Sequence, residues 1–323
     1  MQTKRQREIM NLQFKTKDFV HLHLHTDYSL LQSTIQIKPL TNQLQNLEMK
    51  ACAITDYGNM YGAISFYNSM KANQIHPILG YEAFVTLGCR FDREASIKAG
   101  ERPYYNLVLL AKDLQGYYNL AYLASKAFTE GLYHKPRIDL ELLAERSEGI
   151  IGLSSGFSGS VLHFLKQNAS ERAFQNAKLL EEIFGKGNFF IEIQDHNLDE
   201  EKKNQKQIIE LARKADIPLV ATNEAYYLTR EDARAQEILL CIGEGKTIND
   251  RTRSELGSDN FYVRSAEEMW AILGRDVPEA LQNTLLIAKC VMLNFRQAKN
   301  FLFLIIQFRQ THIAQPRTNT LKK

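Results

Sequence analysis

Residues 20–26 read VHLHLHT, an alternation of apolar side chains and imidazoles near the start of the chain. Successive side chains of an extended strand point to opposite faces, so the three histidines share one face and the apolar residues the other. Two histidines at positions i and i+2 stand about 7 Å apart at their Cα atoms, so both rings can reach one metal ion or two neighbouring ions. The stretch predicts a strand, and two interpretations of its polar face remain open: a metal site, or a hydrated and hydrogen-bonded surface.

Length and composition are those of an ordinary globular chain. It has 323 residues, 44% of them hydrophobic and 24% charged, and a formal net charge of +3. This fits one large α/β barrel or two ordinary domains, and the charge alone identifies no nucleic-acid partner. The most apolar run, 301–308, is far below the ~20 residues that span a bilayer, so we expect no membrane partner. The cysteines form no CxxC pair, which argues against a zinc ribbon or disulfide framework and favours a cytoplasmic protein: Cys52, Cys89, Cys241 and Cys290.

Short apolar segments alternate with longer helical patterns. The predicted strands lie near residues 19–25, 51–55, 77–85, 104–111, 149–154, 188–194 and 217–222, and the predicted helices near 38–49, 60–73, 113–131, 170–185 and 199–215. This alternation is typical of parallel βαβ units, and about seven strands favour a closed or nearly closed barrel. An open doubly wound sheet is the alternative, although no glycine-rich phosphate loop follows the first strand.

Polar residues stand at the carboxyl ends of five of these strands. In parallel α/β barrels the loops that follow the strands converge there and form the site. Such residues also cap helices or form turns, but the repetition over five strands favours a site over caps alone. The residues are His23 and His25, Asp56, Glu82, Asp195 and His196, and Asn223 and Glu224.

Beyond residue 230 the alternation ends. Residues 231–242 predict an amphipathic helix, the stretch SAEEMWAIL begins a second helix with a serine cap, and a third spans roughly 278–292. We divide the chain into a basic extension (1–17), a barrel (18–229), a helical connection (230–293) and an atypical tail (294–323), which we expect to be disordered. We interpret Lys4, Arg5 and Arg7 of the extension as solvated rather than as DNA contacts.

Several motifs resemble one family in order and spacing. FVHLHLHTDYSLL, AITDYGNMYGAISFY, HPILGYEAFV, LVLLAKDLQGYYNLAYLAS, KPRIDLELL and FFIEIQDHNLDE are similar to the polymerase-and-histidinol-phosphatase (PHP) domain, in the form that bacterial DNA polymerase III alpha subunits carry at their N-terminus. ATNEAYYLTREDARAQEILL and FYVRSAEEMWAIL resemble the connection of those subunits toward the polymerase palm. The resemblance implies a distorted seven-stranded α/β barrel, followed here by a short helical extension. It also implies a cluster of metal ions that hydrolyses phosphate esters, in some polymerases as a 3′–5′ exonuclease.

The resemblance also identifies metal-ligand positions, and this chain keeps only some of them. His23, His25, Asp56 and Glu82 match, and Glu224 stands where the family has an aspartate. Other positions depart from the pattern. Tyr57, Asn106 and Tyr226 stand where histidines are usual, Phe157 replaces a cysteine or histidine, and Gln32 falls where an acidic or histidine ligand is found. His134 and His196 are further candidate ligands, which we interpret instead as surface or hydrogen-bonded histidines. We therefore expect at most a weakly held divalent ion, zinc or manganese, on a degenerate site.

The function that this implies is a structural one. We expect the PHP domain of a replicative DNA-directed DNA polymerase that serves as a scaffold and docks the proofreading exonuclease subunit and other replicase subunits. DNA would be engaged only through the longer parent protein. The three palm aspartates of the polymerase reaction lie beyond this length of chain, so we interpret the chain as a fragment that does not polymerise DNA by itself. The alternatives are a metal-dependent phosphoesterase of the histidinol phosphatase type and a residual 3′–5′ exonuclease with a partial metal site.

Overall fold

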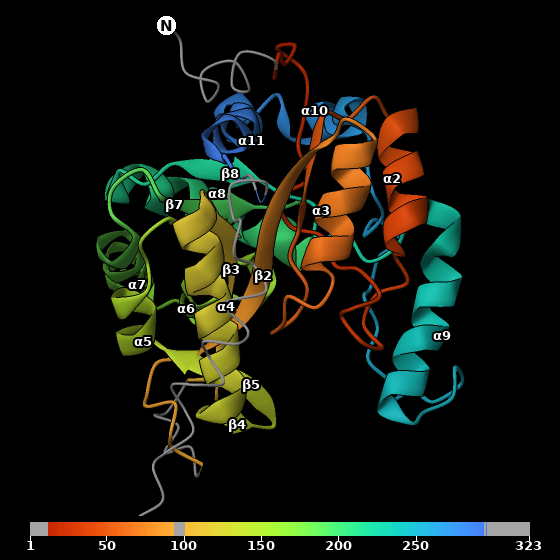
Figure 1. The fold of residues 1–323 in the computed structure, drawn as a ribbon. Coiled ribbons are helices and arrows are strands. Elements are labelled where there is room, and N and C mark those ends of the chain that lie inside the picture. Colours follow the sequence, from red (N-terminus) through yellow and green to blue (C-terminus); the bar gives the residue numbers. More distant parts are fainter. Residues whose placement is uncertain (1–11, 94–100, 294, 296–323) are drawn as a thin grey trace, which may run out of the picture. The chain divides into compact units, whose positions relative to one another are not determined.

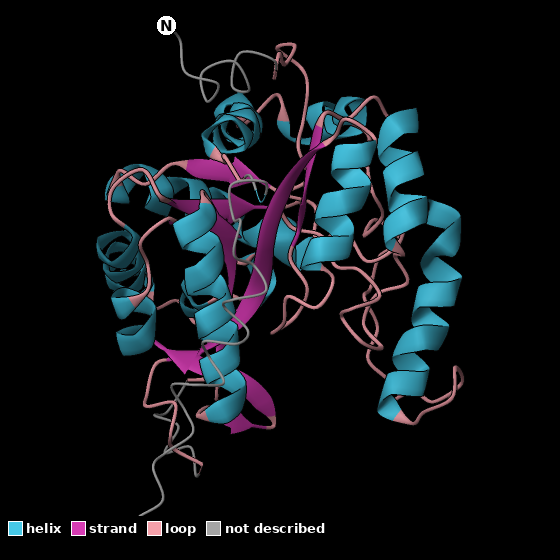
Figure 2. Cartoon of the chain, viewed as in Figure 1, coloured by secondary structure: helices cyan, strands magenta, loops and turns pink. Residues whose placement is uncertain are grey.

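Strands and helices alternate along the computed structural model, which describes residues 12–93, 101–293 and 295 (Figures 1 and 2). The strands are β1 (Ala51–Ile54), β2 (His76–Thr86), β3 (Tyr105–Ala111), β4 (Leu132–Tyr133), β5 (Lys135–Asp139), β6 (Ile150–Leu153), β7 (Phe189–Ile193) and β8 (Leu219–Ala221). The α-helices are α2 (Ile37–Asn46), α3 (Ala63–Ala72), α4 (Leu114–Thr129), α5 (Leu140–Glu145), α6 (Ser160–Lys166), α7 (Ser170–Phe184), α8 (Asp199–Ala215), α9 (Ala233–Glu244), α10 (Ala266–Leu273) and α11 (Pro278–Cys290). Two single 3₁₀ turns, Gly156–Ser158 and Arg230–Asp232, complete them.

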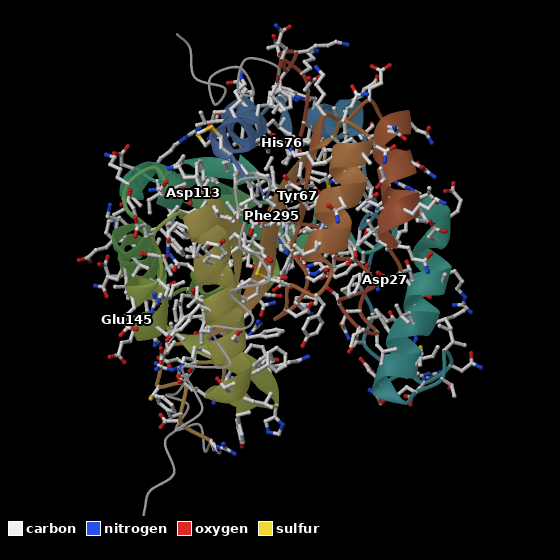
Figure 3. All side chains as sticks on the ribbon, in the orientation of Figure 1. Asp27, Tyr67, His76, Asp113, Glu145 and Phe295 are labelled. Carbon is white, nitrogen blue, oxygen red and sulfur yellow. The ribbon has the colours of Figure 1, made fainter. Side chains whose placement is uncertain are left out.

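Local signals in the sequence position several helix ends. The Asp113 side chain (labelled in Figure 3) accepts a hydrogen bond of 3.0 Å from the backbone N–H of Gly116 and caps α4. Ser265 caps α10 in the same way, and the Glu268 side chain accepts a hydrogen bond of 2.7 Å from the Ser265 N–H. Gly185, whose φ is +80°, ends α7. These ends match the predicted helices to within a few residues.

The strands form a curled sheet, and the 20–26 segment connects the end near β8 with β1. Hydrogen-bonded neighbours run in the order β4-β5-β2-β3-β6-β7-β8, and β1 pairs with β2. Leu24 bridges Ala225 just after β8, while His21 bridges Cys52 of β1, and both bridges are parallel. A path of hydrogen bonds therefore passes from β8 through the segment to β1 and back to β2. Seven strands form the hydrogen-bonded path and β1 lies beside it, which agrees with the expected distorted seven-stranded barrel. Residues 20–26 contribute isolated bridges rather than a continuous strand.

One strand runs against the predicted direction. β3 is antiparallel to both of its neighbours, β2 and β6, so the expectation of uniformly parallel βαβ units was wrong. A parallel connection requires a crossover, usually a helix, whereas an antiparallel pair needs only a loop. The sequence shows no helical pattern between residues 86 and 104, and this absence of a crossover helix could have predicted that β2 and β3 are antiparallel.

The barrel core is apolar and includes a helix from the C-terminal part of the chain. Eight apolar residues of the predicted strands are all buried: Val20, Leu22, Ile54, Ile78, Leu107, Leu109, Ile151 and Leu219. Leu285, Ile287, Ala288 and Val291, from α11 and the residue after it, pack in the same cluster as Val20, Leu22 and Ile78. This burial supplies the main stabilisation of the fold and needs no metal ion.

Helix α11 lies at the end of the barrel where β2 and β8 begin. Its Asn283 donates a 2.7 Å hydrogen bond to the carbonyl of Leu219, and Thr284 accepts one of 3.3 Å from the N–H of Val20. His76 (labelled in Figure 3) opens β2, and its Nε2 donates to the carbonyl of Val291 at 3.0 Å. Side chains later along the same strands therefore lie toward the opposite end of the barrel.

The predicted domain boundaries stay predictions. Residues 12–293 belong to one compact unit, and α11 shares the barrel core although we assigned it to the connection (230–293). The basic residues Lys4, Arg5 and Arg7 and nearly all of the tail (294–323) lie outside the described residues. Among the described helices, none is both long and apolar enough to cross a membrane.

Candidate metal site

Four buried side chains from three separate parts of the chain converge inside the barrel. His23 and His25 come from the 20–26 segment, Glu82 from the middle of β2, and Glu224 from the residues after β8. One nitrogen or oxygen of each lies within 4.8 Å of those of the other three. The histidines and Glu82 are fully buried and Glu224 is 5% exposed. These are four of the five residues that the sequence predicts as metal ligands.

Glu82 lies between the two imidazoles. Its Oε2 is 3.1 Å from Nε2 of His23 and 3.1 Å from Nε2 of His25. Burial alone would raise the pKa of this carboxyl group, but the neighbouring His23 and His25 outweigh burial and lower it. Burial would likewise lower the pKa of His23, but Glu82, Glu192 and Glu224 together raise it well above its usual value. With no ion bound, a protonated His23 therefore balances these carboxylates.

The sequence analysis missed Glu192, which contacts His23 from the other side. Its Oε1 lies 3.0 Å from Nδ1 of His23, and the residue is 2% exposed in the middle of β7. A signal was available, because Glu192 is the one charged residue in the apolar strand FFIEI. A charged side chain inside a buried strand requires a partner.

Two tyrosines occupy the space beside His25. Tyr57 stacks on one side of the imidazole at a centroid distance of 4.1 Å, and Tyr226 stacks at 4.9 Å. Their hydroxyl groups lie 2.6 Å apart, and both donate to Oε1 of Glu224, Tyr57 at 3.2 Å. Burial and the nearby carboxylates raise the pKa of both phenols well above the usual value, so the rings stay neutral. Neutral phenols thus stand where the resemblance implies histidine ligands.

Asp56 does not join the four. Its Oδ1 accepts hydrogen bonds from the Thr26 N–H at 2.6 Å and the Ser29 hydroxyl at 2.7 Å, and its Oδ2 accepts one from the Thr26 hydroxyl at 2.8 Å. Both oxygens thus hold the turn that follows His25. Asp56 is not one of the four converging residues, and its assignment as a ligand stays a prediction.

The remaining candidates lie elsewhere. The buried His196 stacks on Phe261, and its Nδ1 is bound to Glu201 at 2.6 Å. His134 is exposed on the β4–β5 hairpin. Gln32 and Asn106 line a neighbouring cavity, and Phe157 lies under the ammonium group of Lys166. None of these belongs to the group of four among the described residues.

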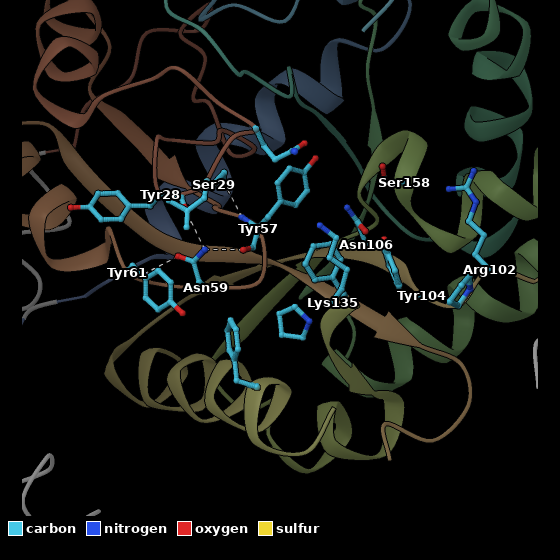
Figure 4. A pocket seen from close by; sticks show the side chains of 16 residues that line it. Tyr28, Ser29, Tyr57, Asn59, Tyr61, Arg102, Tyr104, Asn106, Lys135 and Ser158 are labelled. Atoms are coloured by element: carbon cyan, nitrogen blue, oxygen red, sulfur yellow. Dashed lines mark hydrogen bonds between the residues drawn. The ribbon is translucent and has the colours of Figure 1, made fainter. Parts of the chain in front are cut away.

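A cavity of about 600 Å³ adjoins the cluster. Figure 4 shows Tyr57 and Asn106 near its middle, Tyr28 and Tyr61 at one side and Arg102 at the other. Its lining is aromatic with two cations, Arg102 and Lys135, and it includes none of the four candidate ligands. Tyr57 both lines the cavity and covers His25, so its ring forms the wall between cavity and cluster.

The four side chains fit a divalent ion. Nε2 of His25 is buried next to Glu82 yet has no hydrogen-bond partner among the described residues, so its lone pair is available to a metal ion. Two imidazole nitrogens and two carboxylates form a donor set that zinc and manganese accept. The burial of two carboxylates in one cluster is also favourable only when positive charge neutralises them.

Comparisons with known proteins agree with this geometry. Residues 21–196 match the PHP domain family. The chain is 45% identical to the DNA polymerase III alpha subunit of Treponema pallidum over 84% of its own length and 23% of that protein. It is 44% identical to that of Thermus aquaticus, over 81% of this chain and 21% of the relative. The chain therefore spans about a quarter or less of the length of these relatives.

A solved structure assigned as a metal-dependent phosphoesterase from Bifidobacterium adolescentis also matches, over 78% of this chain and 95% of that one. The identity is 11% and the TM-score 0.39, so this likeness says nothing about function. The family match covers more than half of the chain and includes three of the four converging residues. This chain belongs to the PHP domain family.

Proposed function

We propose that this chain serves as the PHP domain of a replicative DNA polymerase alpha subunit and holds one divalent ion, zinc or manganese, in a structural role. The ligands are His23, His25, Glu82 and Glu224. The observation that supports it is the group of four buried ligand atoms within 4.8 Å, separated from the nearest cavity by the ring of Tyr57. An ion there neutralises the carboxylates and links the 20–26 segment to β2 and to the end of β8.

A single ion is proposed because, within the described part of the chain, only one group of potential ligands converges. Tyr57 and Tyr226 are neutral phenols, and Asp56 is bound to Thr26 and Ser29. We therefore leave Asp56 out of the ligand set. When bound, a divalent ion supplies positive charge and polarises its ligands; hydrolysis additionally requires an open coordination position that substrate can reach. The covering rings of Tyr57 and Tyr226 exclude substrate and bulk water from the cluster.

The role in replication rests on the relatives, which are alpha subunits of DNA polymerase III. We propose that the domain acts in DNA replication in the cytoplasm as a scaffold that docks the proofreading exonuclease subunit. Nucleotidyl transfer and DNA contacts would belong to the parent protein, because the relatives are about four times longer than the part that this chain matches.

The test is metal content by elemental analysis of protein purified without chelator, together with the double variant His23→Ala/His25→Ala. We expect close to one equivalent of zinc or manganese in the wild type and none in the variant. No metal in either protein would refute the site. Two or more ions per chain, lost in the variant, would refute the single structural ion in favour of a multinuclear centre.

A second candidate function is a residual phosphoesterase or 3′–5′ exonuclease. The cavity beside the cluster favours it, because aromatic rings next to Arg102 and Lys135 suit a nucleic-acid end, with bases stacked and phosphates paired. Its test is manganese-dependent release of nucleotides from single-stranded DNA. Release that His25→Ala abolishes would support this candidate, and equal rates in wild type and variant would refute it.

A further inference from the structure

Both oxygens of Glu192, a carboxylate next to the candidate metal site, have hydrogen-bond partners. Its Oε1 accepts a hydrogen bond of 2.6 Å from the Thr222 hydroxyl and lies 3.0 Å from Nδ1 of His23. Its Oε2 accepts a bond from the backbone N–H of Ser155. Burying a carboxylate costs several kcal/mol unless such partners compensate. Glu192 is nonetheless outside the group of four, so its burial needs another reason.

The geometry of His23 supplies that reason. Its two ring nitrogens face two different carboxylates, Nδ1 toward Glu192 and Nε2 toward Glu82. An imidazole that binds a metal offers one nitrogen as a lone pair and keeps its proton on the other, and the hydrogen bond of the second nitrogen decides which is which. An ionised carboxylate only accepts hydrogen bonds. Glu82 belongs to the group of four and Glu192 does not, so with an ion bound the proton would stay on Nδ1, toward Glu192, and Nε2 would be left to the cluster.

We infer that Glu192 is a positioning residue of this site, which fixes the tautomer and ring orientation of His23 for metal binding. The inference rests on the proposed function, since it concerns the same ion. Carboxylates that hold a metal-bound histidine in this way raise its basicity as a ligand.

Ser155 joins the positioning residue to the ligands. It donates its hydroxyl to Oε1 of Glu82 and its backbone N–H to Glu192. Its backbone lies in the left-handed region (φ 61°, ψ 39°), which is uncommon for a residue other than glycine. The turn after β6 thus places one residue between the two carboxylates that contact His23.

The experiment compares zinc affinity in Glu192→Gln and Glu201→Gln, measured by competition with a chelating dye. Glu201 is the matched control, because it is also buried and bound to Nδ1 of a buried histidine, His196, outside the cluster. In E192Q an N–H₂ group, which only donates, replaces one of the two carboxylate oxygens. It therefore cannot accept from at least one of the groups that now donate to Glu192, which are His23, Ser155 and Thr222. We expect zinc to bind 10–100-fold more weakly in E192Q, and the affinity of E201Q to equal that of the wild type.

A second readout separates positioning from general destabilisation. In zinc-loaded wild type, nitrogen NMR should show a proton on Nδ1 of His23, and this signal should shift or vanish in E192Q. If E192Q does not fold, the zinc affinity of Thr222→Val is compared with that of the wild type instead. This variant removes one donor to Glu192 and should weaken zinc binding several-fold. Equal zinc affinity in wild type and in E192Q, or in T222V where E192Q does not fold, overturns this inference alone. Wild type that binds neither zinc nor manganese overturns the proposed function and this inference with it.

Discussion

The imidazole of His25 stacks on the phenol ring of Tyr57, with centroids 4.1 Å apart and ring planes inclined by 23°. Tyr226 covers His25 as well, with planes 10° apart. Both tyrosine rings thus pack against the imidazole, whose Nε2 lies 3.1 Å from Glu82. The same contact makes Tyr57 part of the cavity wall, so one residue both orients a candidate ligand and closes the site.

Tyr57→Ala should destabilise the protein and open the cluster to the cavity. Truncating a fully buried large aromatic side chain typically costs about 3–5 kcal/mol. Tyr57 is only partly buried, so we expect the lower end of this range, and the hydroxyl contacts to Glu224 and Tyr226 are lost as well. Urea unfolding measures the change. Tyr61 is the control, because it lines the same cavity but is 62% exposed. Tyr61→Ala should change stability by no more than about 0.5 kcal/mol; equal losses in both variants would contradict a wall formed by Tyr57.

Glu224→Gln should separate metal binding from hydrogen bonding. The glutamine carbonyl can still accept from Tyr57 and Tyr226, so stability without metal should change by only about 1 kcal/mol. Zinc at 100 times its Kd should stabilise wild type by about 2.7 kcal/mol, and E224Q, which has one charged ligand fewer, should gain less at the same concentration. Thermal unfolding with and without zinc checks this. An equal zinc-induced shift in both proteins would exclude Glu224 as a ligand.

Leu285→Ala and Leu286→Ala test whether α11 is part of the barrel. Leu285 packs with Val20 and Ile78 in the core, whereas its neighbour Leu286 is 51% exposed. We expect L285A to lower the free energy of unfolding by about 2–5 kcal/mol and L286A to have little effect. Denaturant unfolding gives both values. If L285A proved as mild as L286A, α11 would not stabilise the barrel.

Much of the fold could be predicted because hydrophobic periodicity is local. Six of the seven predicted strands and the caps at Asp113 and Ser265 appear close to where the sequence indicates. The direction of β3 depends instead on which strands meet in space, and no short pattern encodes that. The packing of α11 into the barrel core is likewise a contact between residues more than 200 positions apart.

The site divides in the same way. His23, His25, Glu82 and Glu224 could be found because each interrupts or follows an apolar strand and matches a family position. Asp56 was predicted on the same grounds, but its carboxylate accepts hydrogen bonds from Thr26 and Ser29. The spacing of residues in the sequence does not show which donors a carboxylate will bind. Glu192 was missed because its function depends on His23, which lies 169 residues away in the sequence.

His76 should make stability depend on pH. Burial and the charge of Lys71 lower the pKa of His76 to about 4, against the hydrogen bond to Val291, which raises it. The unfolded chain takes up this proton near pH 6.5, while the folded protein resists it. The contribution of His76 is therefore complete above about pH 6.5 and decreases as the pH falls toward 4, by on the order of 3 kcal/mol at about 1.4 kcal/mol per pKa unit.

His76→Gln can keep the donor to Val291 but does not titrate, so its free energy of unfolding should fall less between pH 7 and pH 4.5. Urea unfolding at several pH values measures both slopes, and the difference isolates His76 because all other titrating groups are shared. Identical slopes would mean that His76 is protonated as readily in the folded protein as in the unfolded chain.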